Sequence, residues 1–401
     1  MNGSDQMSRL GNESPSIPRF RLWVKNLGEI ERAYGVSTAR FIRDALKARL
    51  QDATGADAYW SESDALATTL GYAGATSVQF GGRAPQDSLS LCAALSMPID
   101  VGRGERVCPL VQLDNVFSPD IPIPGRWGLA RQASVWLTAS SSGVWAEQFC
   151  HDMTQMAGFL DSLCAGELHL AFQPVVQLMD VSAVLYEEVL LRRGGAGLGR
   201  EIQAVERGGV AWILDRSVVW AGIRILERYP AKRIACNVSG ASFYPDRWWF
   251  EVIEFLSSQP DVAARLVIEI TETSALRDKC TALELVNALR EVGVLIAVDD
   301  VGVGSCTLAF LLEASPAFIK IDRAILGAAM ETSEGRRRFL TLLRLCDSCT
   351  PCVVVEGVER SAELDFLRQF EEVRAVQGFA IARPDAMAEW LSPELRALQL
   401  P

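Results

Sequence analysis

The chain from about residue 165 onward alternates short runs rich in β-branched residues with amphipathic stretches. Each run ends in a polar residue, and each amphipathic stretch places apolar residues at helical spacing, so the pattern predicts alternating strands and helices. The predicted strands are 168–176, 184–191, 233–239, 266–271, 294–300, 318–322, 352–357 and 375–379. A span of about 235 residues suits a single (β/α)8 barrel, which typically needs roughly 250.

Residues 19–150 follow a different pattern, in which loops rich in Ser, Gly and Pro surround one helix predicted at 38–50. Apolar residues at helical spacing predict a linker helix at 151–163, which leaves 164–401 for the barrel. The polar segment 1–18 predicts a disordered tail. The predicted fold class is therefore α/β, with a C-terminal (β/α)8 TIM-like barrel behind a smaller N-terminal α/β domain.

The composition narrows the classes of function. The chain holds 50 acidic and 39 basic residues, and its formal net charge of -11 argues against binding DNA. Its apolar runs are far shorter than the roughly 18 residues of a membrane span, so we expect a cytoplasmic protein. Most of the ten cysteines lie inside apolar segments, which favours reduced thiols over a zinc site. With only two histidines in the chain, carboxylates are the candidates for acid–base chemistry.

Oxygen-bearing side chains stand at the ends of five predicted strands, and the active sites of such barrels lie at the carboxyl ends of their strands. Carboxylate and amide oxygens are ligands for Mg²⁺ or Mn²⁺, whereas zinc and copper usually recruit His or Cys. Any one of these acids alone is as well explained as a strand end or a helix cap. Their recurrence favours a metal site formed by Glu188, Asn237, Glu269 with Glu272, Asp299 with Asp300, and Glu356.

Lys320 lies within an apolar predicted strand. An uncompensated ammonium there would be costly, so we expect it to face the acids and to orient a water molecule or help deprotonate it. For Asp322 and Glu359, a surface ion pair explains the residue as well as a role in the site does.

Eight motifs within roughly residues 152–390 resemble the EAL family in order and spacing. They read Phe-Gln-Pro, Glu-Val-Leu-Leu-Arg, Asn-Val-Ser, Glu-Ile-Thr-Glu, Asp-Asp-Val-Gly-Val-Gly, Lys-Ile-Asp, Glu-Gly-Val-Glu and Gln-Gly-Phe, beginning at Phe172, Glu188, Asn237, Glu269, Asp299, Lys320, Glu356 and Gln377. The resemblance implies metal-dependent hydrolysis of one phosphodiester bond of cyclic di-GMP to linear pGpG, in a homodimer that serves bacterial second-messenger signalling.

The resemblance also implies a role for each matching residue in a two-metal site. Four ligands would bind the first metal: Glu188, Asn237, Glu269 and Asp299. Asp299 would bridge to the second metal, which Asp300 and Glu356 would serve together with the attacking water. Lys320 would position that water. The substrate would be contacted by Gln173, Arg192 and Gln377, and Glu272 would anchor the loop that follows Asp300.

Two departures from the family pattern leave alternatives open. The hairpin before Glu188 is one residue longer than usual, so Glu187 competes with Glu188 for the same role. The loop after the aspartates is divergent over 301–307, which motivates a catalytically silent receptor that binds cyclic di-GMP and signals through partner-protein contacts. A third reading is a scaffold that has lost ligand binding.

The N-terminal region resembles the GGDEF family more faintly, through 22–35, 38–50 and 129–145. At the position of the family signature the chain reads Glu-Ser-Asp-Ala-Leu, from Glu62 to Leu66. Loss of the glycines prevents close approach of a phosphate, and loss of the acids removes metal ligands. The resemblance therefore implies a degenerate domain without cyclase activity, which would dimerise or contact a regulatory partner protein.

Overall fold

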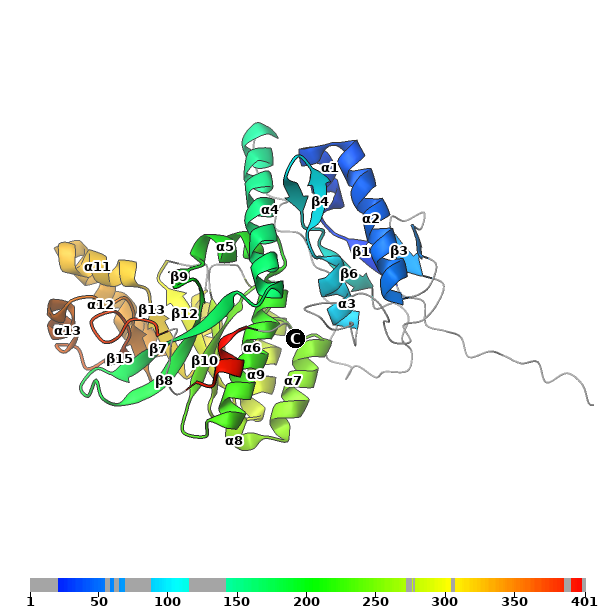
Figure 1. The fold of residues 1–401 in the computed structure, drawn as a ribbon. Helices are drawn as coiled ribbons and strands as arrows, with labels where there is room; N and C mark the ends of the chain where they lie inside the picture. Colours follow the sequence, from blue (N-terminus) through cyan, green and yellow to red (C-terminus); the bar gives the residue numbers. More distant parts are fainter. Residues whose placement is uncertain are drawn as a thin grey trace, which may run out of the picture.

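The structure is a computed structural model that describes residues 21–54, 58–60, 65–68, 88–114, 142–271, 276, 278–303, 307–385 and 391–398. It contains an N-terminal unit and a barrel, joined by the long helix α4 (Ser142–Cys164). Figure 1 shows α4 running between the N-terminal unit, coloured blue to cyan, and the barrel, coloured green to red.

The N-terminal unit is a small α/β arrangement within the described residues. Its sheet has the order β2–β3–β1–β6 and is antiparallel throughout, with β1 (Arg21–Val24), β2 (Ala58–Trp60), β3 (Ala65–Thr68) and β6 (Val111–Asp114). The other elements are α1 (Leu27–Tyr34), α2 (Val36–Thr54), α3 (Ser88–Leu95) and the hairpin of β4 (Ile99–Gly102) and β5 (Glu105–Val107). Ile42, Leu46 and Leu50, four residues apart, form the buried stripe of α2, which contains the helix predicted at 38–50.

The barrel closes through eight strands of the described chain. They are β7 (Leu168–Gln177), β8 (Val184–Arg193), β10 (Ile234–Ser239), β11 (Leu266–Thr271), β12 (Leu295–Val301), β13 (Phe318–Ile321), β14 (Val353–Val355) and β15 (Val373–Val376). The pairing runs from β10 through β15 to β7 and β8, and β8 pairs with β10 to complete the ring. Strand β7 is antiparallel to both neighbours, and the other pairs are parallel. The predicted fold class is confirmed.

Helices surround the barrel, and the short strand β9 (Ala196–Gly197) extends it beside β8. The helices are α5 (Gly199–Arg207), α6 (Ala211–Arg228), α7 (Arg247–Ser257), α8 (Pro260–Ala263), α9 (Lys279–Glu291), α10 (Leu308–Ala314), α11 (Arg323–Glu331), α12 (Ser333–Asp347), α13 (Ser361–Leu367) and α14 (Pro393–Arg396). The side chains of Asp246, Asp278 and Thr332 accept backbone N–H groups at the starts of α7, α9 and α12, which explains where these helices begin. Among the described residues, none of the helices combines the length and apolarity that crossing a membrane requires.

Helix α4 contacts both units. It begins at Ser142, so the predicted boundary between 150 and 151 falls inside a continuous helix. On the barrel side, its fully buried Asp152 forms an ion pair with Arg207 of α5 at 2.7 Å. On the other side, Arg106 of β5 pairs with Asp161. The buried apolar residues of the two units form one continuous cluster through α4.

Candidate active site

Polar side chains from six neighbouring strands meet inside the barrel, at the carboxyl end of its parallel strands. The strand registers bring them together, because Gln173 lies opposite Glu188 and Asn237 lies beside Glu269. Within a strand, alternate residues share a face, so residues such as Glu188 and Lys320 point into the barrel above an apolar layer.

Lys320 is fully buried at the centre of this group. Its ammonium lies 2.6 Å from Glu356, 2.8 Å from Glu269, 3.2 Å from Glu188 and 3.4 Å from Asp299. A buried ammonium is tolerated only when nearby anions compensate for its lost hydration. The four carboxylates do so, and the arrangement still holds more negative than positive charge.

Because the group holds more carboxylates than cations, neighbouring carboxylates raise the pKa values of several of its acids. Burial and the carboxylates of Glu188 and Asp299 raise the pKa of Glu269 to about 8 against the opposing effect of Lys320. Burial and the carboxylate of Asp299 hold the pKa of Glu356 well above its ordinary value. For Glu188, burial acts upward, but Lys320 and two side-chain amides outweigh it and lower the pKa. An added cation would relieve this repulsion.

The acids form two potential cation sites that share Asp299. Glu188, Glu269 and Asp299 offer one group of oxygens, and Asp299, Asp300 and Glu356 offer a second, each within 4.8 Å. Among the described residues, Oδ1 of Asn237 and Oε1 of Glu269 are buried without a hydrogen-bond partner. Unsatisfied oxygen acceptors beside carboxylates are suited to a hard divalent cation. The residues therefore fit such an ion.

The backbone explains how two consecutive aspartates reach one place. The register of β12 shifts between Val298 and Val301, as in a β-bulge, and Asp300 has a φ of 56°. In a regular strand the two side chains would point to opposite faces. The shift and the left-handed conformation, which Asp tolerates better than most residues, bring both carboxylates to the same side.

The predicted substrate contacts lie around Glu188. Nε2 of Gln377 donates to Oε2 of Glu188 at 2.6 Å and lies 3.4 Å from Oε1 of Gln173. Gln173 in turn donates to the carbonyl oxygen of Ala382 at 3.0 Å. Arg192 lies on the same strand four residues beyond Glu188, and its guanidinium donates to the carbonyl of Leu191. Partial burial lowers the pKa of Arg192, while Glu188 opposes the shift.

Three further acids near the motifs have their own partners. Asp322 still lies near the group, because burial and the charges of Asp299 and Asp322 raise the pKa of Asp300 to about 7. Glu187 pairs with Lys232 at 2.8 Å on the outer face of β8. Asp322 accepts the backbone N–H of Ala324 as the N-terminal cap of α11. Glu359 pairs with Arg323 at 3.7 Å, and the side chains of Glu359 and Arg323 are both exposed. The predicted loop anchor Glu272, and residues 304–306 of the divergent loop, lie outside the described residues.

Two buried acids beside the site escaped the sequence analysis. Burial raises the pKa of Asp215 in α6 to about 7, and its carboxylate accepts the backbone N–H of Ser239 at 3.2 Å. Burial also raises the pKa of Glu206 to about 7, with the charge of Asp300 adding to the shift while Arg207 opposes it. The sequence could have indicated that Asp215 is buried, because it directly follows the apolar run Trp-Ile-Leu.

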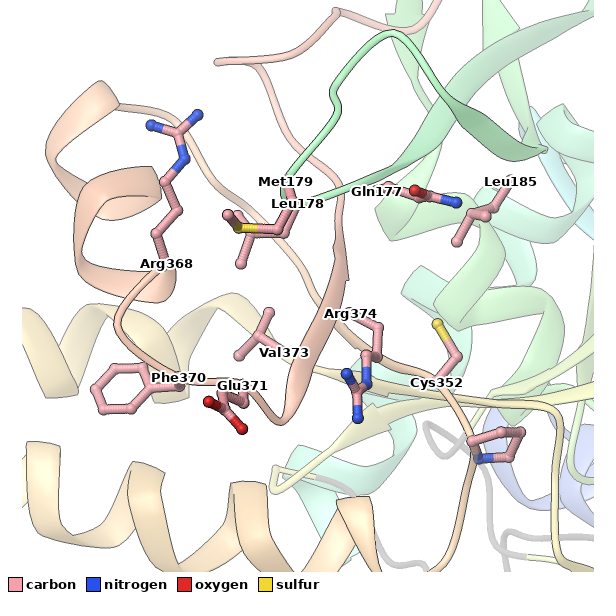
Figure 2. A pocket seen from close by; sticks show the side chains of 11 residues that line it. Gln177, Leu178, Met179, Leu185, Cys352, Arg368, Phe370, Glu371, Val373 and Arg374 are labelled. Carbon is pink, nitrogen blue, oxygen red and sulfur yellow. The ribbon is translucent and has the colours of Figure 1, made fainter.

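A cavity of about 590 Å³ lies at the other end of the barrel, where the parallel strands begin. Figure 2 shows Leu185, Cys352, Val373 and Arg374 around it, together with Gln177 at the end of the antiparallel strand β7. Residues at this end of such barrels serve stability, whereas the chemistry takes place at the opposite end. The cavity is therefore separate from the acid group.

Comparisons with known proteins identify the barrel. A family model described as "EAL domain" matches residues 157–384. The bifunctional diguanylate cyclase/cyclic di-GMP phosphodiesterase MucR of Pseudomonas aeruginosa is 27% identical over 247 residues, 59% of this chain and 35% of the relative. The cyclic di-GMP phosphodiesterase NbdA of the same organism is 27% identical over 252 residues, 58% of this chain and 32% of the relative.

The alignments thus span about a third of the length of these relatives. A crystal structure of an EAL domain protein from Listeria monocytogenes EGD-e has the same fold, with a TM-score of 0.51 and 20% identity over 57% of this chain and 93% of that one. Since the family model covers more than half of the 401 residues, the chain belongs to the EAL domain family.

Proposed function

We propose that the protein hydrolyses cyclic di-GMP to linear pGpG with Mg²⁺ or Mn²⁺ as cofactor, in bacterial second-messenger signalling. The observation that carries the proposal is the group of four carboxylates around Lys320, arranged as two cation sites that share Asp299. The names of the relatives MucR and NbdA supply the substrate.

The first cation would be held by Glu188, Asn237, Glu269 and Asp299, and the second by Asp299, Asp300 and Glu356. When bound, the cations would polarise the attacking water and stabilise charge on the phosphate. Glu356, fixed 2.6 Å from Lys320, would accept a proton from that water, and Lys320 would hold the water in line with phosphorus. The new bond from the water oxygen to phosphorus would replace the bond to one sugar oxygen, which would leave with a proton from solvent and so open the ring. Gln377 would keep Glu188 oriented through its 2.6 Å hydrogen bond.

Substrate binding would rest on Arg192, Gln173 and Gln377. A phosphodiester anion approaching a protein of net charge -11 needs local positive charge, and Arg192 lies on the same strand as Glu188. The amides of Gln173 and Gln377 lie beside Glu188 and offer hydrogen bonds to the dinucleotide.

The rest of the chain would regulate this site. We assign 1–18 to a tail, 19–150 to a degenerate GGDEF-like regulatory domain, 151–163 to the linker and 164–401 to the phosphodiesterase barrel of a cytoplasmic homodimer. The ion pairs Arg106–Asp161 and Arg207–Asp152, one on each side of α4, support a mechanical connection between the units. A partner protein binding the first domain could act on the barrel through this helix.

The test is incubation of the purified full chain with cyclic di-GMP and either Mg²⁺ or Mn²⁺, with chromatographic detection of the linear dinucleotide. We expect product that disappears with EDTA and in the Glu188→Ala variant. Absence of product from a folded protein supplied with either metal would refute the proposal. If cyclic di-GMP still bound tightly in that case, the result would establish the silent receptor instead.

A further inference from the structure

Tyr186 places a phenol directly beneath the acid group. The apolar layer below the acids consists of Val175, Tyr186, Ala235, Val267, Ala297, Phe318, Val354 and Ala375. Tyr186 precedes Glu188 by two residues on β8, and Phe318 precedes Lys320 by two residues on β13, so each points to the same side as its polar successor. The two aromatic rings pack edge to face, with centroids 4.9 Å apart.

The hydroxyl of Tyr186 is the polar group in this layer. It is buried without a well-formed hydrogen bond among the described residues, and the carboxyl group of Glu269 lies near enough to act as its partner. Oε1 of Glu269 is also buried without a hydrogen-bond partner among the described residues, while Oε2 of Glu269 accepts from Lys320 at 2.8 Å. A phenol keeps its proton at neutral pH, so the hydroxyl of Tyr186 is available as a donor.

A phenylalanine would fill the same space without burying a hydroxyl. Two residues of this layer are small, Ala235 on the adjoining strand β10 and Ala297 on β12, and they leave the ring room to reach toward Glu269. Burying a hydroxyl costs free energy unless it finds a partner, and Glu269 has a free acceptor nearby.

We propose that Tyr186 is a positioning residue, whose hydroxyl donates from below to Oε1 of Glu269 and orients this carboxylate toward the cation. Lys320 would hold the other oxygen, so the carboxylate would be fixed at both ends. A carboxylate oxygen has two lone pairs, which allows Oε1 to accept from the phenol and bind a cation at once. The inference rests on the proposed function for the cation.

The experiment is titration of the metal-free full chain with Mn²⁺ and no nucleotide, followed by electron paramagnetic resonance. We expect Tyr186→Phe to weaken Mn²⁺ binding about tenfold, the effect typical of losing a residue that orients a metal ligand. With cyclic di-GMP, activity lost at low Mn²⁺ should return at high Mn²⁺ with an unchanged KM. Tyr229→Phe is the matched control, because that hydroxyl accepts the backbone N–H of Ser392 at 2.8 Å; it should bind Mn²⁺ as the wild type does.

Unchanged Mn²⁺ affinity in Tyr186→Phe would overturn the inference and reduce Tyr186 to a space-filling residue. Failure of the wild type to bind Mn²⁺ would instead defeat the proposed metal dependence itself. Circular dichroism checks the fold, and Tyr186→Leu provides a second variant without the hydroxyl. Wild-type affinity in either folded variant counts against the role.

Discussion

Glu187 and Glu188 are consecutive in β8, yet their carboxylates lie on opposite faces of the barrel wall. Glu187 pairs with Lys232 on the outer face at 2.8 Å, whereas Glu188 lies 3.2 Å from Lys320 inside. Strand alternation alone accounts for the difference. The longer hairpin before Glu188 made both residues candidates for the site. The structure places Glu188 beside the other acids, and Glu187 on the opposite face.

The two glutamates give a matched test of the site. Glu188→Gln should lower the turnover of cyclic di-GMP by about 100-fold or more, because a neutral amide replaces a proposed metal ligand. Glu187→Gln should leave turnover nearly unchanged, since it alters an ion pair on the outer face of the barrel wall, away from the acids. Initial rates of pGpG formation decide the matter, and a larger loss in Glu187→Gln would contradict the assignment.

Lys320→Met should destabilise the metal-free protein. Without its ammonium, the carboxylates of Glu188, Glu269 and Glu356 would be buried uncompensated, so we expect the free energy of unfolding to fall by about 3–5 kcal/mol. Mn²⁺ should restore part of this loss by replacing the missing positive charge. Urea denaturation with EDTA and with Mn²⁺ measures both effects.

Lys279→Met is the control for this experiment, because Lys279 pairs with Glu313 on the surface. Its effect should stay within about 1 kcal/mol and should not depend on Mn²⁺. Equal losses in the two lysine variants would show that the central ammonium is not needed to balance the acids.

Gly378→Ala should disturb the site through the backbone. Gly378 has a φ of 155°, and a Cβ there would lie 2.2 Å from the carbonyl oxygen of Val358. Relief of this clash would shift the neighbouring Gln377, so we expect a loss of about 3 kcal/mol in stability together with lower activity. In Gly327→Ala the new Cβ meets nothing within 4 Å on helix α11, so stability should stay equal or rise by up to about 1 kcal/mol. Thermal melts that rank the two variants alike would contradict the prediction.

Asp215 gives a pH dependence with a defined sign. Its pKa rises from 3.8 to about 7 in the folded protein, so the folded state binds more protons than the unfolded state between these values. Stability should therefore fall as pH rises through this window, by roughly 1.4 kcal/mol per pH unit from this group. Asp215→Asn cannot ionise, and its stability relative to the wild type should increase from pH 4 to pH 8.

Denaturation of both proteins across that range measures the difference. Asp365→Asn supplies a control for replacing a carboxylate by an amide, because Asp365 is exposed and pairs with Arg368 on the surface. A constant difference between Asp215→Asn and the wild type would mean that Asp215 is already ionised throughout the range.

The sequence predicted the barrel because strands buried on both faces read as uninterrupted apolar runs. Polar residues that end such runs are conspicuous, as is Lys320 inside one. Other features depend on contacts between distant segments. The left-handed conformation of Asp300 follows from a register shift between β12 and β13, and nothing in the local sequence indicates it.

Buried acids are harder to predict from the sequence in helices than in strands. Glu206 and Asp215 lie in helices, where a single acid usually faces solvent, and only the packing of α5 and α6 against the barrel shows that both are buried. Tyr186 looked like an ordinary strand residue, because its proposed role depends on Glu269 of another strand. In the first turns of α4, Trp145 stacks on Phe149 of the same helix, and Arg32 from the distant helix α1 covers Trp145.

The continuous apolar cluster through α4 couples the unfolding of the two units. Phe149, Met153 and Met156 of α4 are fully buried within this cluster, and the family match begins one residue later, at 157. Unfolding of the N-terminal unit would expose part of this cluster to water. The two units should therefore melt together, in one cooperative heat-absorption peak rather than two.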